Sequence, residues 1–299
     1  MSGLPELHRH LDGSLRRATL DALADAVGVS VPAELGFRPG MGLAAALACF
    51  EVTLSTLQTA DSVRRVADEM CEDAAAEGIT TFEVRFAPQL HRGAALEAIV
   101  DAAVDGLAGR AGLLLCGLYG EPPSVLDALV EAARTRPGVV GIDLAGGPGG
   151  ADDWRMTDYA AAFTRARDLG LGRTVHAGEG RPPAEIRIAI EQLHAQRIGH
   201  GTTLLEDGRV LDLVLARGVT IEACPTSNLQ TGAIARAEDH ALPRWLALGV
   251  RATVCTDNTL LSRIDLPTEL ARARALPGMT DARLAEAIAH GHAAAFDRG

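Results

Sequence analysis

The sequence predicts an α/β protein, a TIM-type (β/α)8 barrel with a helical insertion after its first strand. Short apolar or β-branched runs alternate with Ala- and Leu-rich stretches of helical periodicity. From the second run onward they begin at intervals of roughly 22 to 34 residues, the length that a strand and its returning helix require. The expected strands are Glu6–Leu11, Thr80–Phe86, Gly112–Leu118, Val139–Leu144, Arg173–His176, Arg197–His200, Val219–Cys224 and Arg251–Thr256.

The insertion is predicted from the gap between Leu11 and Thr80, which is too long for one helix. In such a barrel the segments that follow strands lie on the face where active sites are built, so we expect an insertion over about 15–77 to form a wall or lid. No change of composition marks a second domain, and residues 1–299 are expected to form one barrel domain. The helical stretches within the gap are near 15–27, 41–57 and 61–77.

The chain is acidic and contains no lysine. Its formal net charge of −11 argues against a nucleic-acid partner, because affinity for a phosphate backbone depends on clustered basic side chains. All 28 basic residues are arginine, which excludes Schiff-base chemistry, pyridoxal phosphate attachment and the P-loop, since each requires a lysine. A small-molecule substrate is therefore expected.

The cysteines indicate a reducing compartment. They are five in number and show no CxxC spacing, so neither a disulfide framework nor a thiolate zinc site is predicted. No charged leader precedes an apolar run at the amino terminus, and no uninterrupted apolar stretch of about eighteen residues occurs. We expect a cytoplasmic protein without a membrane partner, and the sequence leaves its oligomeric state open.

Four polar side chains at predicted strand ends are candidate metal ligands. His8 and His10 are two residues apart on one strand, so both point to the barrel interior. An isolated HxH is more often a pair of hydrogen-bonded core histidines. Here, however, His176 and Asp257 also end separate strands, and nitrogen and oxygen ligands without thiolate suit a catalytic zinc site.

Two further residues are candidates for proton transfer. Glu179 follows His176 by three residues across a glycine turn, which places a carboxyl group beside the metal. Alone, it would more commonly cap the helix expected near Pro182 or Pro183. His200 ends the sixth strand at the same barrel mouth and could orient or deprotonate a water held by the metal.

These residues lie in segments that resemble the adenosine deaminase family of the amidohydrolase superfamily. The resemblance covers nearly the whole chain, with the segments in the family's order and each at a predicted strand end. It independently implies the same barrel. The matching segments are ELHRHLDGSL, FEVRFAP, GIDLAGG, TVHAGEG, RIGHGTTLLED, IEACPTSNLQTGA and VCTDN.

The resemblance implies one zinc ion and a hydrolytic deamination. His8, His10, His176 and Asp257 match the zinc ligands of the family. A second metal is not expected, because two-metal relatives generally use a carboxylated lysine and this chain has none. Water would attack the amine-bearing carbon of a purine while Glu179 protonates the adjacent ring nitrogen.

The resemblance also assigns the remaining roles. His200 and Asp257 would manage the proton of the attacking water. Asp12 matches a residue near the ribose, and Gly146 one whose backbone contacts the purine. The expected substrate contacts are His10, Asp12, Gly146 and Asn258.

One position departs from the family pattern and affects the choice of substrate. Well-known members carry two consecutive aspartates where this chain has Asp257 and Asn258. The Asn258 amide can still donate to a purine nitrogen. The expected substrate is adenosine or a similar 6-aminopurine nucleoside, with a 5'-modified nucleoside such as aminodeoxyfutalosine or free adenine as alternatives. A metal-dependent amide, imide or ester hydrolase and a non-catalytic binding barrel are the hypotheses from other classes.

Overall fold

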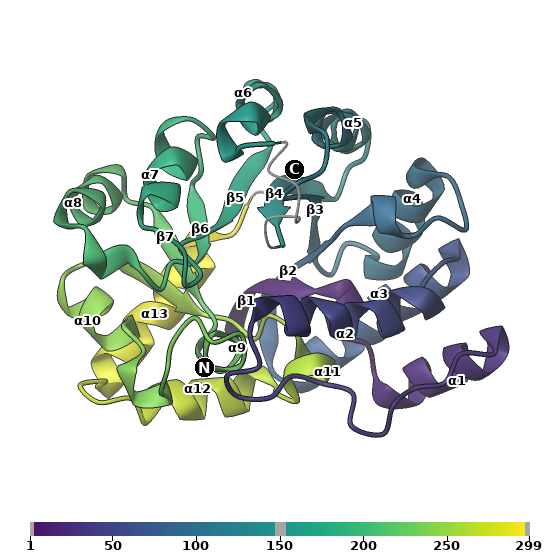
Figure 1. Cartoon of the computed structure of the whole chain (residues 1–299), viewed down its shortest axis with the longest axis horizontal. Coiled ribbons are helices and arrows are strands. Elements are labelled where there is room, and N and C mark those ends of the chain that lie inside the picture. Colours follow the sequence, from purple (N-terminus) through teal and green to yellow (C-terminus); the bar gives the residue numbers. More distant parts are fainter. Residues whose placement is uncertain (1–2, 147–153, 297–299) are drawn as a thin grey trace.

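The computed structural model describes residues 3–146 and 154–296 and shows the predicted barrel (Figure 1). Eight parallel strands are hydrogen-bonded in sequence order, so each strand lies beside the next one along the chain. The helices that connect them lie outside the strands (Figure 1). The strands are β1 Leu4–His10, β2 Ile79–Phe86, β3 Gly112–Leu118, β4 Val139–Ala145, β5 Gly172–Ala177, β6 Arg197–His200, β7 Thr220–Ala223 and β8 Arg251–Val254.

All eight predicted strands are present, and the differences are confined to their ends. The eighth strand is the clearest case, since it ends at Val254 instead of Thr256. Beyond it the chain turns toward the first strand, where Asp257 pairs with Arg9 in a parallel bridge. The Asp257 amide donates to the His8 carbonyl at 2.8 Å, and the His10 amide donates to the Asp257 carbonyl at 2.8 Å. These two hydrogen bonds join the last strand region to the first and close the barrel.

The side chain of Glu6 reinforces this closure. Its carboxylate accepts hydrogen bonds from the amide of Thr256 at 3.0 Å and from the Thr256 hydroxyl at 2.7 Å. The same carboxylate accepts from the His8 amide at 3.0 Å. A buried acidic residue on β1 therefore fixes the segment that carries Asp257, as well as the backbone of His8.

The three helices expected between the first two strands are present, but they have different positions. α3 packs against α4 and β2, as an ordinary outer helix of the barrel does. α2 packs on α1 and on the turn after β1, and it borders the mouth of the barrel. The helix α3 begins with a capping box between Thr59 and Ser62. The bounds are α1 Arg17–Val27, α2 Leu43–Thr56, α3 Ala60–Ala76 and α4 Leu96–Leu107.

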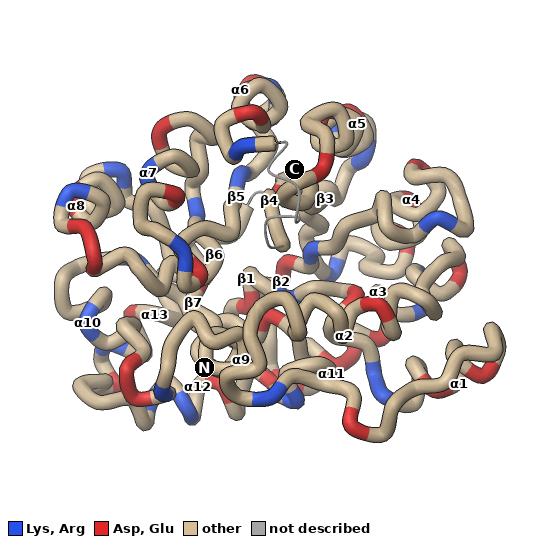
Figure 2. The backbone as a smooth tube through the Cα atoms, in the orientation of Figure 1, with Lys and Arg blue, Asp and Glu red and all other residues tan. Residues whose placement is uncertain are grey.

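Most of the other helices complete the outer ring, whereas the short helices α9 and α11 contact each other. α13 packs across β8 and β1, and Gly291 permits this close approach because a Cβ there would lie 2.5 Å from Pro5. Acidic and basic residues are interspersed over the ring helices (Figure 2). The bounds are α5 Pro123–Arg134, α6 Ala160–Asp168, α7 Ala184–Glu191, α8 Gly208–Arg217, α9 Pro225–Gln230, α10 Leu242–Ala247, α11 Thr259–Ser262, α12 Leu266–Arg274 and α13 Asp281–Ala294.

The interior of the barrel is charged, whereas the layer between strands and helices is apolar. Leu, Ile, Val and Ala side chains of the strands and ring helices form one large buried cluster. Inside the barrel the structure instead buries ionisable side chains with at most 2% exposure. Such groups require partners, because an unpaired buried charge is strongly unfavourable. These interior residues include Glu6, Glu83, Arg85, Asp143, Arg197 and Glu222.

Within the described residues, no one helix is both long and apolar enough to cross a bilayer. The pair α2 and α3 would satisfy length and composition together, with a bend of 116° between them.

The junction of β4 and β5 should be sensitive to a single methyl group. These strands pair at Gly141 with Gly172, and a Cβ at position 141 would lie 2.7 Å from the Gly172 carbonyl oxygen. We expect Gly141→Ala to lower the free energy of unfolding by about 1–3 kcal/mol, because backbone must move to admit it. Urea unfolding followed by circular dichroism measures the change. Gly208→Ala, where a Cβ meets nothing within 4 Å, is the control, and equal stability of the two variants would contradict the packing argument.

Candidate metal and active site

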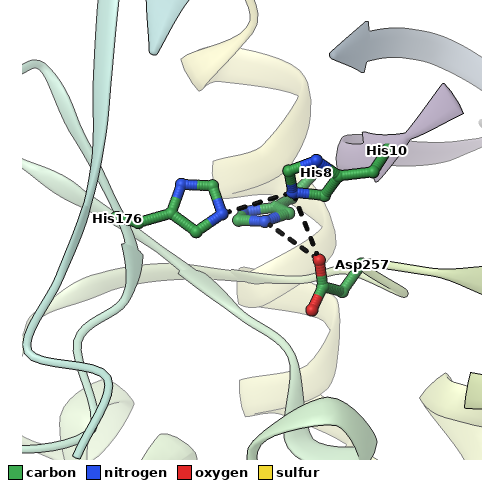
Figure 3. Close-up of side chains that lie close together, drawn as sticks. All are labelled: His8, His10, His176 and Asp257. Atoms are coloured by element: carbon green, nitrogen blue, oxygen red, sulfur yellow. Dashed lines mark hydrogen bonds and ion pairs between the residues drawn. The ribbon is translucent and has the colours of Figure 1, made fainter. Parts of the chain in front are cut away.

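The four predicted metal ligands converge at the carboxyl ends of their strands (Figure 3). His8 and His10 come from β1 and His176 from β5, while Asp257 follows β8. The Nε2 atoms of His10 and His176 are 3.2 Å apart. The Oδ1 atom of Asp257 is 3.4 Å from the Nε2 atoms of both His8 and His10. One donor atom from each residue lies within 4.8 Å of the donor atoms of the other three, so a single cation could bind all four.

The orientation of the imidazoles fits a metal ion. The Nδ1 atom of His8 is 2.7 Å from a Glu222 carboxylate oxygen, and that of His176 is 3.0 Å from Asp143. When Nδ1–H donates to a carboxylate, the Nε2 lone pair faces the other way, as in metal-binding histidines. The Nε2 atom of His8 is buried and has no hydrogen-bond partner among the described residues. Three nitrogens and one carboxylate oxygen without thiolate are a donor set that suits catalytic zinc.

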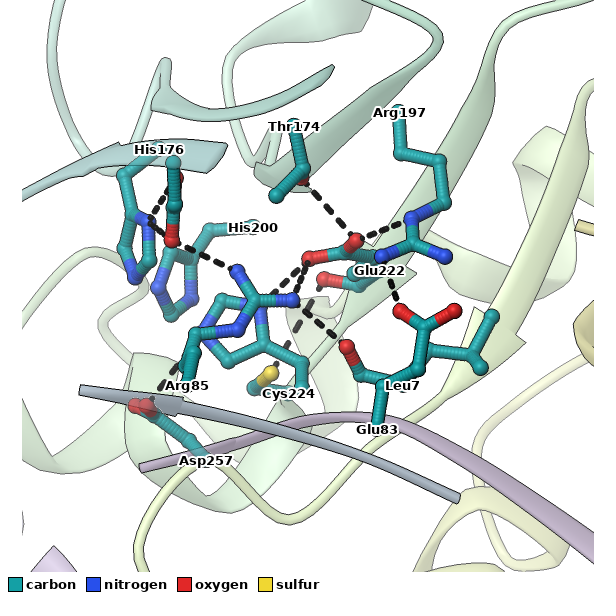
Figure 4. A network of polar contacts seen from close by, with 12 residues as sticks. Leu7, Glu83, Arg85, Thr174, His176, Arg197, His200, Glu222, Cys224 and Asp257 are labelled. Carbon is teal, nitrogen blue, oxygen red and sulfur yellow. Dashed lines mark hydrogen bonds and ion pairs between the residues drawn. The ribbon is translucent and has the colours of Figure 1, made fainter. Parts of the chain in front are cut away.

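Beneath the histidines, two arginines neutralise the carboxylates that orient them (Figure 4). Arg85 donates to Asp143 at 2.8 Å and to Glu222 at 2.9 Å. Arg197 lies 2.7 Å from the other oxygen of Glu222. Burial would raise the pKa of Glu222, but Arg85 and Arg197 hold it well below its usual range. The carboxylate is therefore ionised and can accept a hydrogen bond from His8 Nδ1–H.

Asp257 and His200 both adopt left-handed backbone conformations, with φ of 65° and 67°. Non-glycine residues rarely do so, and such conformations gather at functional sites. Ser227 donates to the Asp257 Oδ2 atom at 2.5 Å, which leaves Oδ1 directed at the histidines. Burial would raise the pKa of Asp257, but the adjacent His8 and the other nearby histidines hold it well below its usual range.

Glu179 lies between two glycines at the mouth of the barrel, with its side chain 10% exposed. Gly178 and Gly180 have φ of 68° and 62°, and this turn aims the carboxyl group into the metal-site cavity. Thr231 donates to its Oε1 atom at 2.9 Å. Burial, helped by repulsion from Asp257, raises the pKa of Glu179 to about 7. The N-cap residue of α7 is Pro183, so capping does not account for Glu179.

The residues expected to contact substrate border the same region. The Oδ1 atoms of Asp12 and Asn258 are buried without a hydrogen-bond partner among the described residues. Burial raises the pKa of Asp12 to about 7. Gly146 has φ of 80° and lines the cavity. Gly13 makes room for Asn258, since a Cβ there would lie 1.9 Å from the amide oxygen.

Two adjoining cavities meet at His10, Leu47, Phe50 and Gly146. The first contains the candidate metal ligands His10, His176 and Asp257 together with Glu179, His200, Thr231 and Asn258. The second, of about 260 Å³, is mostly apolar and is lined by His10, Asp12, Leu47, Phe50, Leu54, Ala87, Leu90, Cys116, Leu118, Tyr119, Ala145 and Gly146.

The structure thus brings together every predicted site residue, although sequence reasoning missed the residues that support them. Arg85, Asp143 and Glu222 are charged residues inside otherwise apolar strands, which is the signal that could have drawn attention to them. All three lie in segments already recognised in the sequence. Their partners could not be named, because the contacts join strands far apart in the chain. The others that were missed are Gly13, Ser227, Asn228, Thr231 and His240.

A parallel barrel with histidine and carboxylate ligands at the carboxyl ends of its strands is the arrangement of metal-dependent hydrolases. The chain belongs to the adenosine deaminase family, whose model matches residues 4–298. Members of this family are hydrolases that act on carbon–nitrogen bonds of cyclic amidines, and this chain is a hydrolase of the same class.

Curated relatives and solved structures agree with this assignment. The adenosine deaminase of Erwinia tasmaniensis is 34% identical, with alignment over 98% of this chain and 93% of the relative. The probable adenosine deaminase of Dictyostelium discoideum is 36% identical over 88% of this chain. The aligned part is 36% of the length of that longer protein. The crystal structure of adenine deaminase from Arthrobacter aurescens superimposes with a TM-score of 0.89 at 26% identity, covering 99% of this chain and 94% of the other.

The carboxylate behind His176 should tune metal affinity. In Asp143→Asn the side chain keeps an oxygen acceptor but loses the charge that Arg85 and His176 share. We expect the zinc dissociation constant to rise about 10–100-fold, measured by competition with a chelator. Glu121→Gln is the control, since this half-buried carboxylate contacts Gln89 and the Leu118 amide instead of a ligand. Equal zinc affinity of Asp143→Asn and wild type would refute the role of Asp143.

Proposed function

We propose that this protein uses one zinc ion to deaminate a 6-aminopurine nucleoside hydrolytically, forming the 6-oxo nucleoside and ammonia. The observation that carries the proposal is the pairing of a four-residue metal-donor cluster with Glu179 in one cavity. His8, His10, His176 and Asp257 would hold the ion. When bound, zinc lowers the pKa of a water toward neutrality and so supplies a hydroxide nucleophile.

The residues of the chain then account for the proton transfers. The addition of water to the amine-bearing carbon disrupts the aromatic ring, and a proton on the adjacent ring nitrogen makes that carbon more electrophilic. Glu179, with a pKa of about 7, holds such a proton near neutral pH and can give it to the ring. The carbon–nitrogen bond then breaks. The amine leaves as ammonia with one of the two protons of the attacking water, and the other restores the acid form of Glu179. Oxygen from water becomes the carbonyl of the product.

The second cavity favours a nucleoside whose 5' end carries no phosphate. Asp12 is the sole carboxylate among the described residues that line this cavity, and no arginine lines it. A phosphate there would find no cation and would face Asp12, whereas ribose hydroxyls could donate to the free Oδ1 atom of Asp12. Free adenine would leave the cavity vacant. The apolar wall suits an uncharged 5' substituent such as the methylthio group of methylthioadenosine.

Turnover of a substrate panel tests the reaction. We expect the zinc-loaded protein to release ammonia from adenosine, 2'-deoxyadenosine or methylthioadenosine, with the ultraviolet change of a 6-aminopurine becoming a 6-oxopurine. Adenine and aminodeoxyfutalosine complete the panel. Glu179→Gln should lower kcat by about 10²–10⁴-fold, because the amide cannot supply the proton. Glu191→Gln, an exposed residue of α7, is the control.

No release of ammonia from any purine by the zinc-loaded protein would contradict the proposal. An activity that Glu179→Gln retains in full would equally contradict the assigned proton donor. In the first case amides and imides become the substrates to screen, since a metal-dependent hydrolase on the same barrel could use the same ligands.

A charge in the second cavity should change which 5' ends are accepted. We expect kcat/KM for methylthioadenosine to exceed that for adenosine 5'-monophosphate in the wild type. Leu54→Arg should lower the ratio of these two kcat/KM values about tenfold, because the new arginine can bind the phosphate. A charge-assisted hydrogen bond is worth roughly 1.5–3 kcal/mol. Leu215→Arg, at an exposed position of α8, should leave the ratio unchanged. An unaltered ratio in Leu54→Arg would show that the 5' end lies elsewhere.

A further inference from the structure

We propose that His240 and Asn228 fix the tautomer of His200, so that its ring proton sits on Nε2 and His200 donates a hydrogen bond into the metal-site cavity. The inference rests on the proposed function for its catalytic consequence. The sequence left His200 able either to orient a water or to deprotonate it. The hydrogen-bond chain behind His200 decides between these two roles.

The chain of hydrogen bonds starts at a backbone amide, which can only donate. The amide of Leu242 donates to the Nδ1 atom of His240 at 3.1 Å, so Nδ1 must carry a lone pair. His240 is 3% exposed, and its ring meets Trp245 edge-on at 5.4 Å between centroids. Burial lowers the pKa of His240 to about 4, which keeps the ring neutral. The single proton of the ring is therefore on Nε2.

Asn228 transmits this orientation. The Nε2 atom of His240 is 3.2 Å from the Asn228 side-chain oxygen, which can only accept. The amide nitrogen of Asn228 must then face the other way, and it lies 2.9 Å from the Nδ1 atom of His200. Asn228 is completely buried, so no solvent competes for either end of the amide.

His200 receives this hydrogen bond on Nδ1 and must carry its proton on Nε2. The Nε2 atom points into the cavity, 3.7 Å from the Glu179 Oε2 atom, and the ring packs against His8 and His176 at 5.0 Å between centroids. An N–H group can hold an oxygen atom in place but cannot take a proton from it. Within the described lining of the first cavity, Asp257 is then the carboxylate able to accept a proton from water, while Glu179 carries the proton for the ring.

The alternative is a purely structural role, in which His240 only anchors the start of α10. The two roles differ in what Asn228→Asp should do. A carboxylate can accept from His240 Nε2–H and from His200, but it cannot donate, so His200 must place a proton on Nδ1. A structural role predicts altered stability with normal chemistry, whereas the tautomer role predicts a redistributed proton and slow chemistry.

The first measurement is the protonation of the His200 ring nitrogens, by ¹⁵N NMR of metal-free protein with labelled histidine, assigned with His200→Gln. We expect wild type to show an unprotonated Nδ1 and a protonated Nε2, and Asn228→Asp to show a protonated Nδ1. This readout needs neither metal nor substrate, so it stands even if no purine is turned over. A protonated Nδ1 in wild type would overturn the proposal.

The second measurement is steady-state kinetics on the best purine substrate of the zinc-loaded protein. Loss of one oriented donor predicts a fall in kcat of about 10²–10³-fold for Asn228→Asp, with KM changed little. His240→Phe keeps the ring against Trp245 but removes both hydrogen bonds, and it should also lower kcat. His240→Gln can still donate to Asn228 and should restore most of the rate. His292→Gln is the control, because the hydrogen bonds of His292 to described residues are with Thr81 and Gly3.

Thermal unfolding of each variant separates folding from chemistry. If Asn228→Asp folds poorly, the comparison of His240→Phe with His240→Gln still tests the chain of hydrogen bonds. Full kcat in His240→Phe, or an Nδ1 proton on His200 in Asn228→Asp accompanied by unchanged kcat, would refute the catalytic consequence. If wild type turns over no purine while its tautomer is as stated, the proposed function fails and the hydrogen-bond relay stands.

Discussion

The site depends on one buried guanidinium. Arg85 lies between Asp143 and Glu222, and these two carboxylates hold the Nδ1 atoms of His176 and His8. Without the positive charge, two buried carboxylates would repel each other and tend to take up protons, and the histidines would lose their fixed orientation. Arg85 and its two carboxylates therefore set the direction of the lone pairs of the candidate metal ligands His8 and His176, and contacts of this kind tune metal sites.

Three polar side chains also hold Asp257, Glu179 and His200 in place. Ser227 directs Asp257, Thr231 contacts Glu179, and Asn228 contacts His200. The three supporting residues lie in or just after α9, the short helix that follows β7. One short segment thus contacts the candidate metal ligand Asp257, the proposed proton donor Glu179 and His200. The left-handed backbone of Asp257 and His200 is tolerated because this surrounding network over-determines it.

The sequence predicted the fold well because the barrel is built from a repeated local pattern. Each strand is an apolar run followed by a helix, so all eight strands were placed, with errors only near the ends. β8 ends early because Asp257 pairs with β1, a contact across nearly the whole chain that no local pattern reveals. The insertion was placed correctly as a whole, yet only packing shows that α3 belongs to the outer ring while α2 borders the mouth.

The sequence by itself determined the chemistry that was available: three histidines and an aspartate at strand ends, Glu179 beside them, and no lysine for other mechanisms. In a parallel barrel all strands end on one face, so side chains from β1, β5 and β8 had to meet there. Tertiary structure alone decided which donor atoms face inward, which carboxylate accepts from which histidine, and which nitrogen of His200 carries the proton. These choices rest on hydrogen bonds between residues such as His8 and Glu222, whose separation of 214 positions hides the pairing from any local pattern.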